Sequence, residues 1–231
     1  MTLWLSRLTL SRSPSVEALK ALIDPAERGR ATDAHHRLIW SAFAGDPDRR
    51  RDFLWRAEGE GVFHVLSARQ PEASPFFEPP EIKAFAPSLA VNDRLEFVLR
   101  ANATRTRKVE RGGQVKKAHD DVVMNALRDI PSGEKRREVR MAVAAEAGGS
   151  WLHAQGGRSG FSVAEVSMID YAVQALPDYR GPRGGQPQFG VLEFTGVIVV
   201  DDPDVLLAKL ALGFGRAKAF GCGMMMIRRA R

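Results

Sequence analysis

The chain has 231 residues, 44% of them hydrophobic, and its 34 Lys and Arg against 28 Asp and Glu give a net charge of +6 and a pI of about 9.8. This length and composition suffice for one sound core or two small ones, and the positive charge favours an anionic partner such as nucleic acid. The single Cys222 excludes a disulfide framework and a cysteine-based zinc site, and no apolar run approaches the ~20 residues of a membrane helix, so we expect a soluble, cytoplasmic protein.

The first half of the chain mixes strand and helix patterns. An alternating apolar strand opens it, and a longer helix follows, for which Thr32 is the predicted N-cap. The predicted elements are a strand at 3–10, a short helix at 15–23, a helix at 32–43 and strands at 51–57 and 61–68. Residues 71–87 contain five prolines, too many for a central strand or a helix interior, so this stretch is predicted to be edge structure and linker.

The second half follows a similar order with longer elements. Leu95, Phe97 and Leu99 alternate in its first strand, which places Arg100 on the opposite face. The predicted elements are a strand at 93–100, helical segments at 118–128, 134–147 and 150–155, strands at 161–175 and 188–200 around a tip at 178–185, a helix at 204–212 and a strand at 223–229. Each half approximates a β-α-β-β-α-β order, although the fourth strand of the first half is poorly defined. We therefore predict an α+β fold with two tandem ferredoxin-like (RRM-like) domains at 1–88 and 89–231.

A glycine-rich loop with two cations lies between the last predicted helix and the last strand. Its notable members are Gly213, Gly215, Arg216, Lys218, Gly221 and Gly223. Glycines let a backbone approach a ligand closely, and loop amides beside cations bind anions. Nucleotide-binding loops run from a strand through glycines into a helix, whereas this loop runs from a helix into a strand. The order therefore favours a phosphodiester backbone over a mononucleotide or NAD.

Two adjacent histidines, His35 and His36, lie on the predicted helix at 32–43. At ~100° per residue, the apolar stripe of this helix passes through His35, which we expect to be packed or capped, while Arg37 points away. Neighbouring side chains diverge by ~100° around a helix, so this pair cannot face one metal ion, and no metal site is predicted. His36 lies at the flank of the stripe, where it can reach a cleft. It is the candidate catalytic residue, and a residue of the helix surface is the alternative.

Further basic residues gather at three places along the second half. They are Arg100, Arg105, Arg107 and Lys108 at and beyond the end of the strand, Arg158 and Ser159 in a tight turn, and Arg180 and Arg183 at the hairpin tip. Arginines on a ribbon or turn clamp phosphates, and the alternative is a solvated, charged surface. The run at 48–52 is predicted to be a solvated corner. Few aromatic residues are placed for base stacking, which favours a folded RNA such as a hairpin, recognised by shape and phosphate contacts.

Several motifs together resemble one family, the CasE family of repeat-processing endoribonucleases of type I-E CRISPR systems. They follow the family's order across essentially the whole chain and are Leu3–Leu5, Ala34–Trp40, Arg51–Arg56, Leu99–Asn102, the segment from Trp151–Leu152 through Gly160–Phe161, Phe194–Gly196 and Gly213–Met226. The last of these is the most specific. The chain departs from some members at Asp33, where they have a tyrosine, and no lysine follows the histidine within residues 41–45.

The resemblance implies two ferredoxin-like domains that bind the stem-loop of the CRISPR repeat, in the precursor transcript and in the mature crRNA, and cut the base of the stem. It implies metal-independent and cofactor-free cleavage, in which the ribose 2′-oxygen attacks the phosphate and leaves a 2′,3′-cyclic phosphate and a 5′-hydroxyl. The family histidine corresponds to His36, as general base or acid. Arg37 is expected to supply the charge of the missing lysine, and Asp33 either replaces a dispensable tyrosine or raises the basicity of His36.

The partners implied by the resemblance are the repeat RNA hairpin and the other Cascade subunits, with no membrane, and the protein is expected to be a monomer outside that complex. Two alternatives from other functional classes remain. One is a non-catalytic tandem RNA-binding module, in which His36 is a residue of the helix surface. The other is a small-molecule enzyme that uses the glycine-rich loop for a nucleotide. Composition and spacing alone reach only a basic, two-domain RNA-binding protein.

Overall fold

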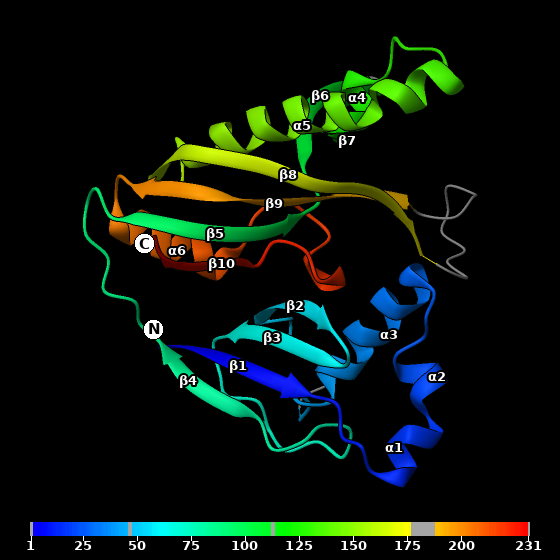
Figure 1. Ribbon diagram of the computed structural model, residues 1–231, viewed down its shortest axis with the longest axis vertical. Coiled ribbons are helices and arrows are strands. Elements are labelled where there is room, and N and C mark those ends of the chain that lie inside the picture. Colours follow the sequence, from blue (N-terminus) through cyan, green and yellow to red (C-terminus); the bar gives the residue numbers. More distant parts are fainter. Residues whose placement is uncertain (1, 46–47, 112–113, 177–187, 231) are drawn as a thin grey trace.

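The computed structural model describes residues 2–45, 48–111, 114–176 and 188–230, and it contains two four-stranded antiparallel sheets. Figure 1 shows two halves stacked along the long axis, the first formed by the N-terminal part of the chain and the second by the C-terminal part. The chain passes from the last strand of the first sheet, which ends at Phe85, to the first strand of the second, which begins at Arg94. The predicted domain boundary between residues 88 and 89 falls in this connection and stays a prediction.

The first half contains three helices and one sheet. Its elements are β1 (Leu3–Thr9), α1 (Pro14–Ala18), α2 (Lys20–Ile23), α3 (Arg28–Trp40), β2 (Phe53–Gly59), β3 (Val62–Ser67) and β4 (Glu81–Phe85). The strand order is β2-β3-β1-β4, so the strand within the proline-rich stretch lies at the sheet edge, as predicted. No helix lies between β3 and β4, and this half lacks the second helix of the expected order. Four prolines between these strands explain its absence, because proline cannot donate the backbone hydrogen bond that a helix needs.

The second half has the longer strands. Its elements are β5 (Arg94–Ala101), β6 (Thr104–Arg111), β7 (Gln114–Asp121), α4 (Val122–Ala126), α5 (Glu134–Gly156), β8 (Phe161–Ala175), β9 (Gln188–Val200), α6 (Pro203–Leu212), the 3-10 turn η1 (Lys218–Phe220) and β10 (Met225–Arg229). The sheet order is β10-β5-β9-β8. In both sheets the fourth strand lies beside the first and the third lies between the first and the second, which is the ferredoxin-like arrangement. The predicted fold class is confirmed.

The core of the second half follows from the alternation in β5. Leu95, Phe97 and Leu99 are 1%, 2% and 0% exposed and point to the helix-covered face of the sheet, whereas Arg100 points to the other face. The helix α5 lies along β8, as Figure 1 shows, and it contributes Leu152 to this core. Burial of these apolar side chains holds the second sheet and its helices together.

Three predicted helix boundaries are wrong. Helix α3 begins at Arg28, and Thr32 is not its N-cap, because its hydroxyl donates to the Arg28 carbonyl one turn earlier, at 2.9 Å. Helix α5 runs through Gly148 and Gly149 without a break. Gly148 allows close packing of the helix on the sheet, because a Cβ there would come within 3.0 Å of the Phe194 ring. Residues 118–121 belong to strand β7 and not to a helix.

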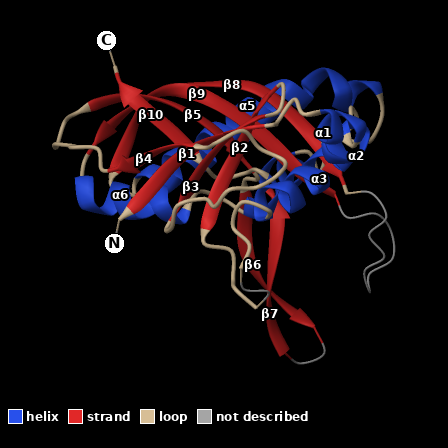
Figure 2. Cartoon of the chain, turned by 90° about the horizontal axis from the view of Figure 1, so that it is seen from below, coloured by secondary structure: helices blue, strands red, loops and turns tan. Residues whose placement is uncertain are grey.

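The hairpin of β6 and β7 was not predicted. Figure 2 shows that it projects from the body of the second half. Its eight register pairs run from Thr104 with Asp121 to Arg111 with Gln114. Most of its side chains are charged or polar on both faces, so no apolar alternation marked these strands in the sequence.

A small apolar cluster joins the two halves. Leu54 of β2 and Leu66 of β3 pack against Met224, which precedes β10, and the three residues are 3%, 4% and 2% exposed. Leu54 and Leu66 lie on the face of the first sheet that is turned away from the core around Ile39 and Phe63. The cluster fixes the glycine-rich segment of the second half against the first sheet.

Candidate active site and nucleic-acid interface

His36 lies at the junction between the first half and the glycine-rich segment. It is half-buried on α3, and its ring centroid is 5.9 Å from that of Phe220 in η1. The indole N–H of Trp40, one helical turn further along α3, donates to Nε2 of His36 at 3.2 Å. The helix thus presents the imidazole to the segment that the sequence predicted to bind RNA.

The surroundings of His36 favour a neutral imidazole. Burial lowers the pKa of His36 below the usual 6.5, the positive charge of Arg51 lowers it further, and Asp33 opposes them. Burial and a nearby cation both disfavour the protonated ring. A histidine that is neutral at pH 7 is able to accept a proton, which a general base requires.

Arg51 is the cation that the sequence analysis missed. Its Nη1 donates to the Phe53 carbonyl at 2.6 Å and to the Lys218 carbonyl at 3.1 Å, so it connects the start of β2 to η1. The prediction of a solvated corner at residues 48–52 is therefore wrong for Arg51, which is half-buried. It was missed because Lys218 lies 167 residues away in the chain.

Lys218 is a second cation beside this junction. Its Nζ donates to the Leu212 carbonyl at 2.6 Å. Burial lowers the pKa of Lys218, and the charges of Lys209 and Arg51 lower it further. Arg51 therefore places a positive charge next to the neutral histidine, and Lys218 adds a second positive charge close to Arg51. Such an arrangement is suited to stabilising a developing phosphorane charge.

Arg37 lies on the outer side of α3. Its side chain is 74% exposed and pairs with Asp33 at 2.9 Å, one helical turn away. Asp33 acts on His36 in the predicted direction, because its charge raises the pKa of His36 against the larger lowering effects of burial and Arg51. The catalytic role of Arg37 stays a prediction.

His35 is a packed histidine, as expected. Its Nε2 lies 2.8 Å from Oδ1 of Asp24, and its ring packs edge-on against Phe63 with centroids 4.8 Å apart. The side chain is only 12% exposed. Burial lowers the pKa of His35, although Asp24 opposes that effect. The adjacent histidines therefore have different environments, one inside the first half and one at its surface.

The glycine-rich loop is shaped by contacts with its own protein. Gly221 lies beneath the Trp55 indole, where a Cβ would come within 3.1 Å of the ring, and the indole N–H donates to the Ala219 carbonyl. The amides of Phe214, Arg216 and Gly223 donate to the carbonyls of Gly223, Asn102 and Arg100, respectively. These amides are not available to converge on an anion, contrary to expectation. Contact of Gly213, Gly215, Gly221 and Gly223 with RNA stays a prediction.

Four of the predicted RNA-binding residues meet in one groove. Arg105 of β6, Arg158 after α5, and Gly215 and Arg216 of the loop line a cavity of about 720 Å³, together with Lys209 of α6, which was not predicted. No carboxylate is among the described residues that line it. Burial lowers the pKa of Lys209, and the charge of Arg158 lowers it further. We call this cavity the basic groove.

Arg107 and Lys108 lie on the projecting hairpin and are exposed. Arg107 forms an ion pair with Asp120 on β7. Lys108 lies opposite Lys117 in the register. Like charges directly opposite each other on neighbouring strands repel, and an anion between them would relieve that repulsion.

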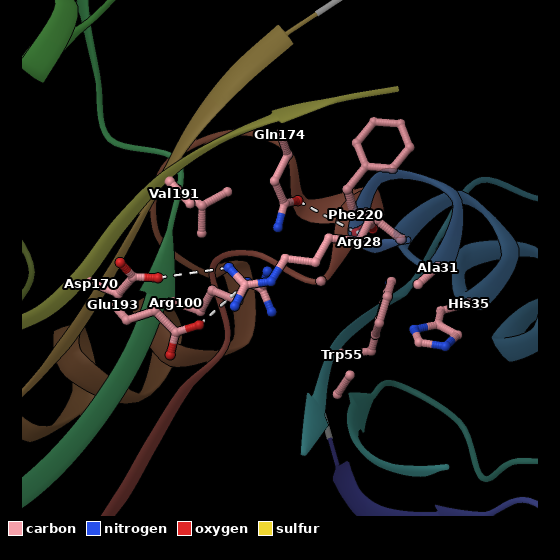
Figure 3. Close-up of a pocket in the computed structure, with 14 residues that line it drawn as sticks. Arg28, Ala31, His35, Trp55, Arg100, Asp170, Gln174, Val191, Glu193 and Phe220 are labelled. Carbon is pink, nitrogen blue, oxygen red and sulfur yellow. Dashed lines mark hydrogen bonds and ion pairs between the residues drawn. The ribbon is translucent and has the colours of Figure 1, made fainter. Parts of the chain in front are cut away.

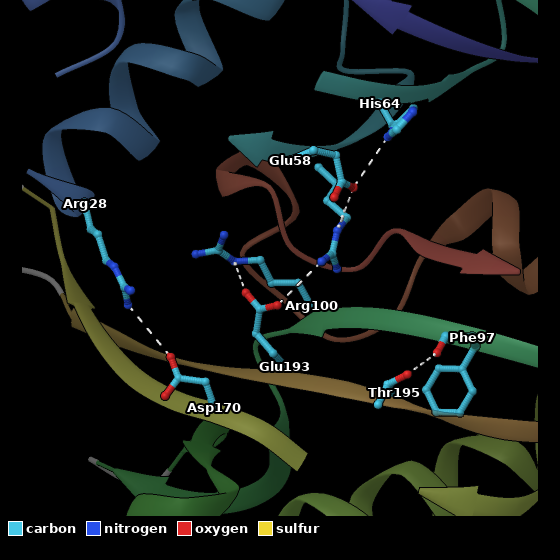
Figure 4. Close-up of polar contacts among 9 residues, drawn as sticks. Arg28, Glu58, His64, Phe97, Arg100, Asp170, Glu193 and Thr195 are labelled. Atoms are coloured by element: carbon cyan, nitrogen blue, oxygen red, sulfur yellow. Dashed lines mark hydrogen bonds and ion pairs between the residues drawn. The ribbon is translucent and has the colours of Figure 1, made fainter. Parts of the chain in front are cut away.

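The other predicted residues have different outcomes. Arg100 lines a cavity between the halves (Figure 3) and is not at a solvated strand end. Its Nε lies 3.7 Å from the Glu193 carboxylate, which also forms an ion pair with Arg56 at 3.5 Å. Figure 4 shows Arg100 and Glu193 on the second sheet, and the ion pair of Glu193 with Arg56 on β2 bridges the two sheets. Ser159 is 1% exposed, so the structure encloses its hydroxyl instead of presenting it to RNA. Arg180 and Arg183 lie outside the described residues.

Comparison with known proteins places this arrangement in a family. The family model for CRISPR associated proteins matches residues 3–229. The chain belongs to this family. It is 24% identical over 202 residues to the CRISPR system Cascade subunit CasE of Escherichia coli K12, which covers 83% of this chain and 89% of that protein. The resemblance to the CasE family is thereby confirmed.

Two solved structures of similar proteins share the fold. Thermus thermophilus Cse3, bound to an RNA that represents a pre-cleavage complex, matches with a TM-score of 0.65 and 21% identity over 99% of this chain and 100% of that one. Escherichia coli K-12 Cas6e matches with a TM-score of 0.60 and 21% identity over 98% of this chain and 100% of that one. The two-sheet architecture is therefore that of these CRISPR proteins.

Neither a membrane span nor a metal-ligand cluster occurs in the described part of this family member. None of its described helices is long and apolar enough to cross a membrane. The described residues also contain no group of three or more His, Cys, Asp and Glu side chains arranged to hold a metal ion.

Proposed function

We propose that the protein is an endoribonuclease that binds the CRISPR repeat stem-loop, cuts at the base of the stem and stays bound to the mature crRNA in a cytoplasmic Cascade complex. The observation that carries the proposal is the position of His36, half-buried against η1 and next to Arg51, which in turn lies close to Lys218. Membership of the CRISPR associated protein family and similarity to a Cse3 bound to RNA support the choice of substrate.

The proposed reaction needs no metal ion. Neutral His36 takes the proton of the ribose 2′-hydroxyl on Nε2, where the hydroxyl replaces the Trp40 N–H as the hydrogen-bond donor, and the 2′-oxygen attacks the adjacent phosphorus. The bond from phosphorus to the 5′-oxygen then breaks, and that oxygen takes a proton from water, which gives a 2′,3′-cyclic phosphate and a 5′-hydroxyl. Arg51 and Lys218, with the predicted Arg37, stabilise the extra negative charge on the phosphate oxygens in the transition state.

The RNA stem is proposed to bind across the basic groove and the β6–β7 hairpin. The groove supplies Arg105, Arg158, Lys209 and Arg216 from four separate elements, and no carboxylate among its described lining residues opposes them. Such phosphate contacts fix the position of a duplex without reading its sequence. Because bound phosphates release counterions, affinity is expected to fall steeply as salt rises.

Incubation with an end-labelled repeat hairpin in EDTA tests this proposal. We expect a single cut at the base of the stem, with a terminus that resists phosphatase until acid opens the cyclic phosphate. His36→Ala should abolish cutting and keep RNA affinity within about tenfold, or ~1.4 kcal/mol. His153→Ala, at an exposed histidine of α5, is the matched control and should cut normally.

Three outcomes distinguish the alternatives. Tight hairpin binding by the wild-type protein without any cut would indicate a non-catalytic RNA-binding module. Cutting only after metal is added would reject the proposed chemistry while keeping the substrate. Stabilisation by a mononucleotide, with no affinity for the hairpin, would indicate a small-molecule enzyme.

A further inference from the structure

A small cavity lies between the two halves, next to Phe220. Its volume is about 220 Å³, and it is lined by α3, β2, β5, β8, β9 and η1. Phe220 lines it and also contacts the His36 ring, and His35, the neighbour of His36 in the chain, lines it as well. The cavity is therefore one side chain away from the proposed general base. Its volume is below the ~300–1,000 Å³ of pockets for drug-sized ligands, so it suits a single ring system.

Two donors at this cavity lack a full set of partners among the described residues. Nε of Arg100 is buried, lies 3.7 Å from Glu193 and makes no hydrogen bond with any described residue. Gln174 is 4% exposed; its side-chain oxygen accepts a weak bond from Thr32 at 3.4 Å, and its amide nitrogen donates to no described residue. Figure 3 shows the Gln174 amide directed from β8 towards the space between Val191 and Arg28. A buried donor without an acceptor costs free energy. Nε of Arg100 is enclosed by the protein, so a ligand with an acceptor atom would recover that cost at the Gln174 amide.

The charges around the cavity select against a phosphate. Arg28 pairs with Asp170 at 3.8 Å at the exposed mouth, and Arg100 pairs with Glu193 deeper inside. Two guanidinium groups and two carboxylates leave no net charge, unlike the basic groove. A phosphate would be repelled by the two carboxylates. A neutral heterocycle with donors and acceptors along one edge would find acceptors for its donors and donors for its acceptors. The faces of Trp55 and Phe220, which also line the cavity, suit a planar ring.

We propose that this cavity binds one unpaired nucleobase of the RNA, from a nucleotide next to the bond that is cut. The inference rests on the proposed function and names the part of the substrate that this second site recognises. A stacked A-form strand holds the 2′-oxygen out of line with the leaving 5′-oxygen. A nucleotide turned out of the stack is free to bring the two oxygens into line at His36, at the cost of unstacking. The base-binding cavity would hold that turned-out nucleotide in place.

An abasic scan of the RNA tests the proposal on the wild-type protein. Each unpaired nucleotide that flanks the cut is replaced in turn by an abasic ribonucleotide, and kcat/KM is measured. We expect one position at which the abasic RNA is cut about tenfold more slowly, the equivalent of one or two hydrogen bonds, while the others change little. Equal cutting of all abasic RNAs would overturn the proposal.

A variant of the cavity completes a double-mutant cycle. Gln174→Leu removes the amide at similar volume, and Gln70→Leu, at an exposed glutamine after β3, is the matched control. In Gln174→Leu, the sensitive abasic position should lose its effect, because the base no longer has its partner, whereas Gln70→Leu should keep the full effect. If the abasic nucleotide lowered kcat/KM of Gln174→Leu by the same factor as that of the wild type, recognition through Gln174 would be refuted.

A binding measurement separates this inference from the proposed function. The same abasic series is prepared in an RNA with a 2′-deoxyribose at the cut, which cannot be cleaved by 2′-oxygen attack, and dissociation constants are measured. Weaker binding at the same single position would support the cavity even if the wild-type protein failed to cut RNA. Uniform affinity across the series, together with normal cutting, would reject the cavity and leave the endoribonuclease proposal intact.

Discussion

The indole N–H of Trp40 donates a hydrogen bond to Nε2 of His36, and the two nitrogens lie 3.2 Å apart. A ring nitrogen that accepts a hydrogen bond must keep its lone pair, so this bond stabilises the neutral ring with its proton on Nδ1. It acts in the same direction as burial and Arg51, which lower the pKa of His36. Trp40 is thus a positioning residue that fixes both the orientation and the protonation state of the imidazole before the ribose 2′-hydroxyl replaces it at Nε2.

Replacing Trp40 should shift the pH dependence of cleavage. Trp40→Phe keeps an aromatic ring and removes the donor, so the pKa of His36 should rise, because the neutral ring loses a hydrogen bond that stabilises it. A general base becomes protonated and inactive as pH falls through its pKa. The acid limb of the kcat/KM profile should therefore move to higher pH together with the pKa of His36. At pH 8 the variant should cut at nearly the wild-type rate.

The control for this experiment is Trp4→Phe, which changes an indole on β1. Its pH profile should match that of the wild type, as should the NMR titration of its His36 ring. An acid limb that stays in place or moves to lower pH in Trp40→Phe would contradict the role assigned to Trp40.

Arg51 should matter more for catalysis than its exposed neighbour. Arg51→Gln removes a half-buried charge next to His36 and the bond to the Lys218 carbonyl, and kcat should fall by about 10²–10³-fold, as for other groups that stabilise transition-state charge. Arg50→Gln makes the same chemical change at an exposed position of the same loop and should leave kcat unchanged. Single-turnover cleavage at saturating protein measures both. Equal losses would mean that net charge, and not the position of Arg51, is responsible.

The basic groove should control affinity and its salt dependence. Lys209→Gln and Arg216→Gln each remove one cation from the groove, so the slope of log K against log salt should become less negative by ~1 for each phosphate that the variant no longer neutralises. Arg12→Gln removes an exposed cation of the first half and should leave the slope unchanged. The measurement is hairpin affinity between low and moderate salt. Unchanged slopes in both groove variants would place the RNA elsewhere.

The parts of the fold that were predictable have a simple repeating pattern. The long strands β8 and β9 were predicted at their observed bounds, since both are rich in β-branched and aromatic residues and flank a segment of turn residues. The β6–β7 hairpin carries charge on both faces, so its sequence holds no period that a strand prediction could use. The continuous helix α5 was split in two because Gly148 favours a break locally, whereas its packing against Phe194 depends on a strand far along the chain.

The site was predictable in its residue types more than in its contacts. His36 was identified from its place at the flank of an apolar stripe and from a family motif, both of which are local. Arg51 acquires its role only through the carbonyl of Lys218, and Lys209 only by meeting Arg158 in the folded groove. A charge run in a sequence does not reveal which of its members becomes half-buried. Contacts between distant segments therefore decided which cations lie at the site.

Gly215 offers a test of how the loop is held. Its φ is +69°, and a Cβ would lie 2.4 Å from the Asn102 carbonyl oxygen, so Gly215→Ala combines left-handed strain with a clash against backbone. We expect a loss of at least about 2 kcal/mol, or a Tm lower by roughly 4–8 °C for a chain of this size. Gly157→Ala is the matched control, because Gly157 has an ordinary φ of −59° and nothing within 4 Å of a new Cβ. It should melt like the wild type, as measured by circular dichroism. Because the Arg216 amide bonds to the same Asn102 carbonyl, RNA affinity should fall with stability in Gly215→Ala and stay constant in the control.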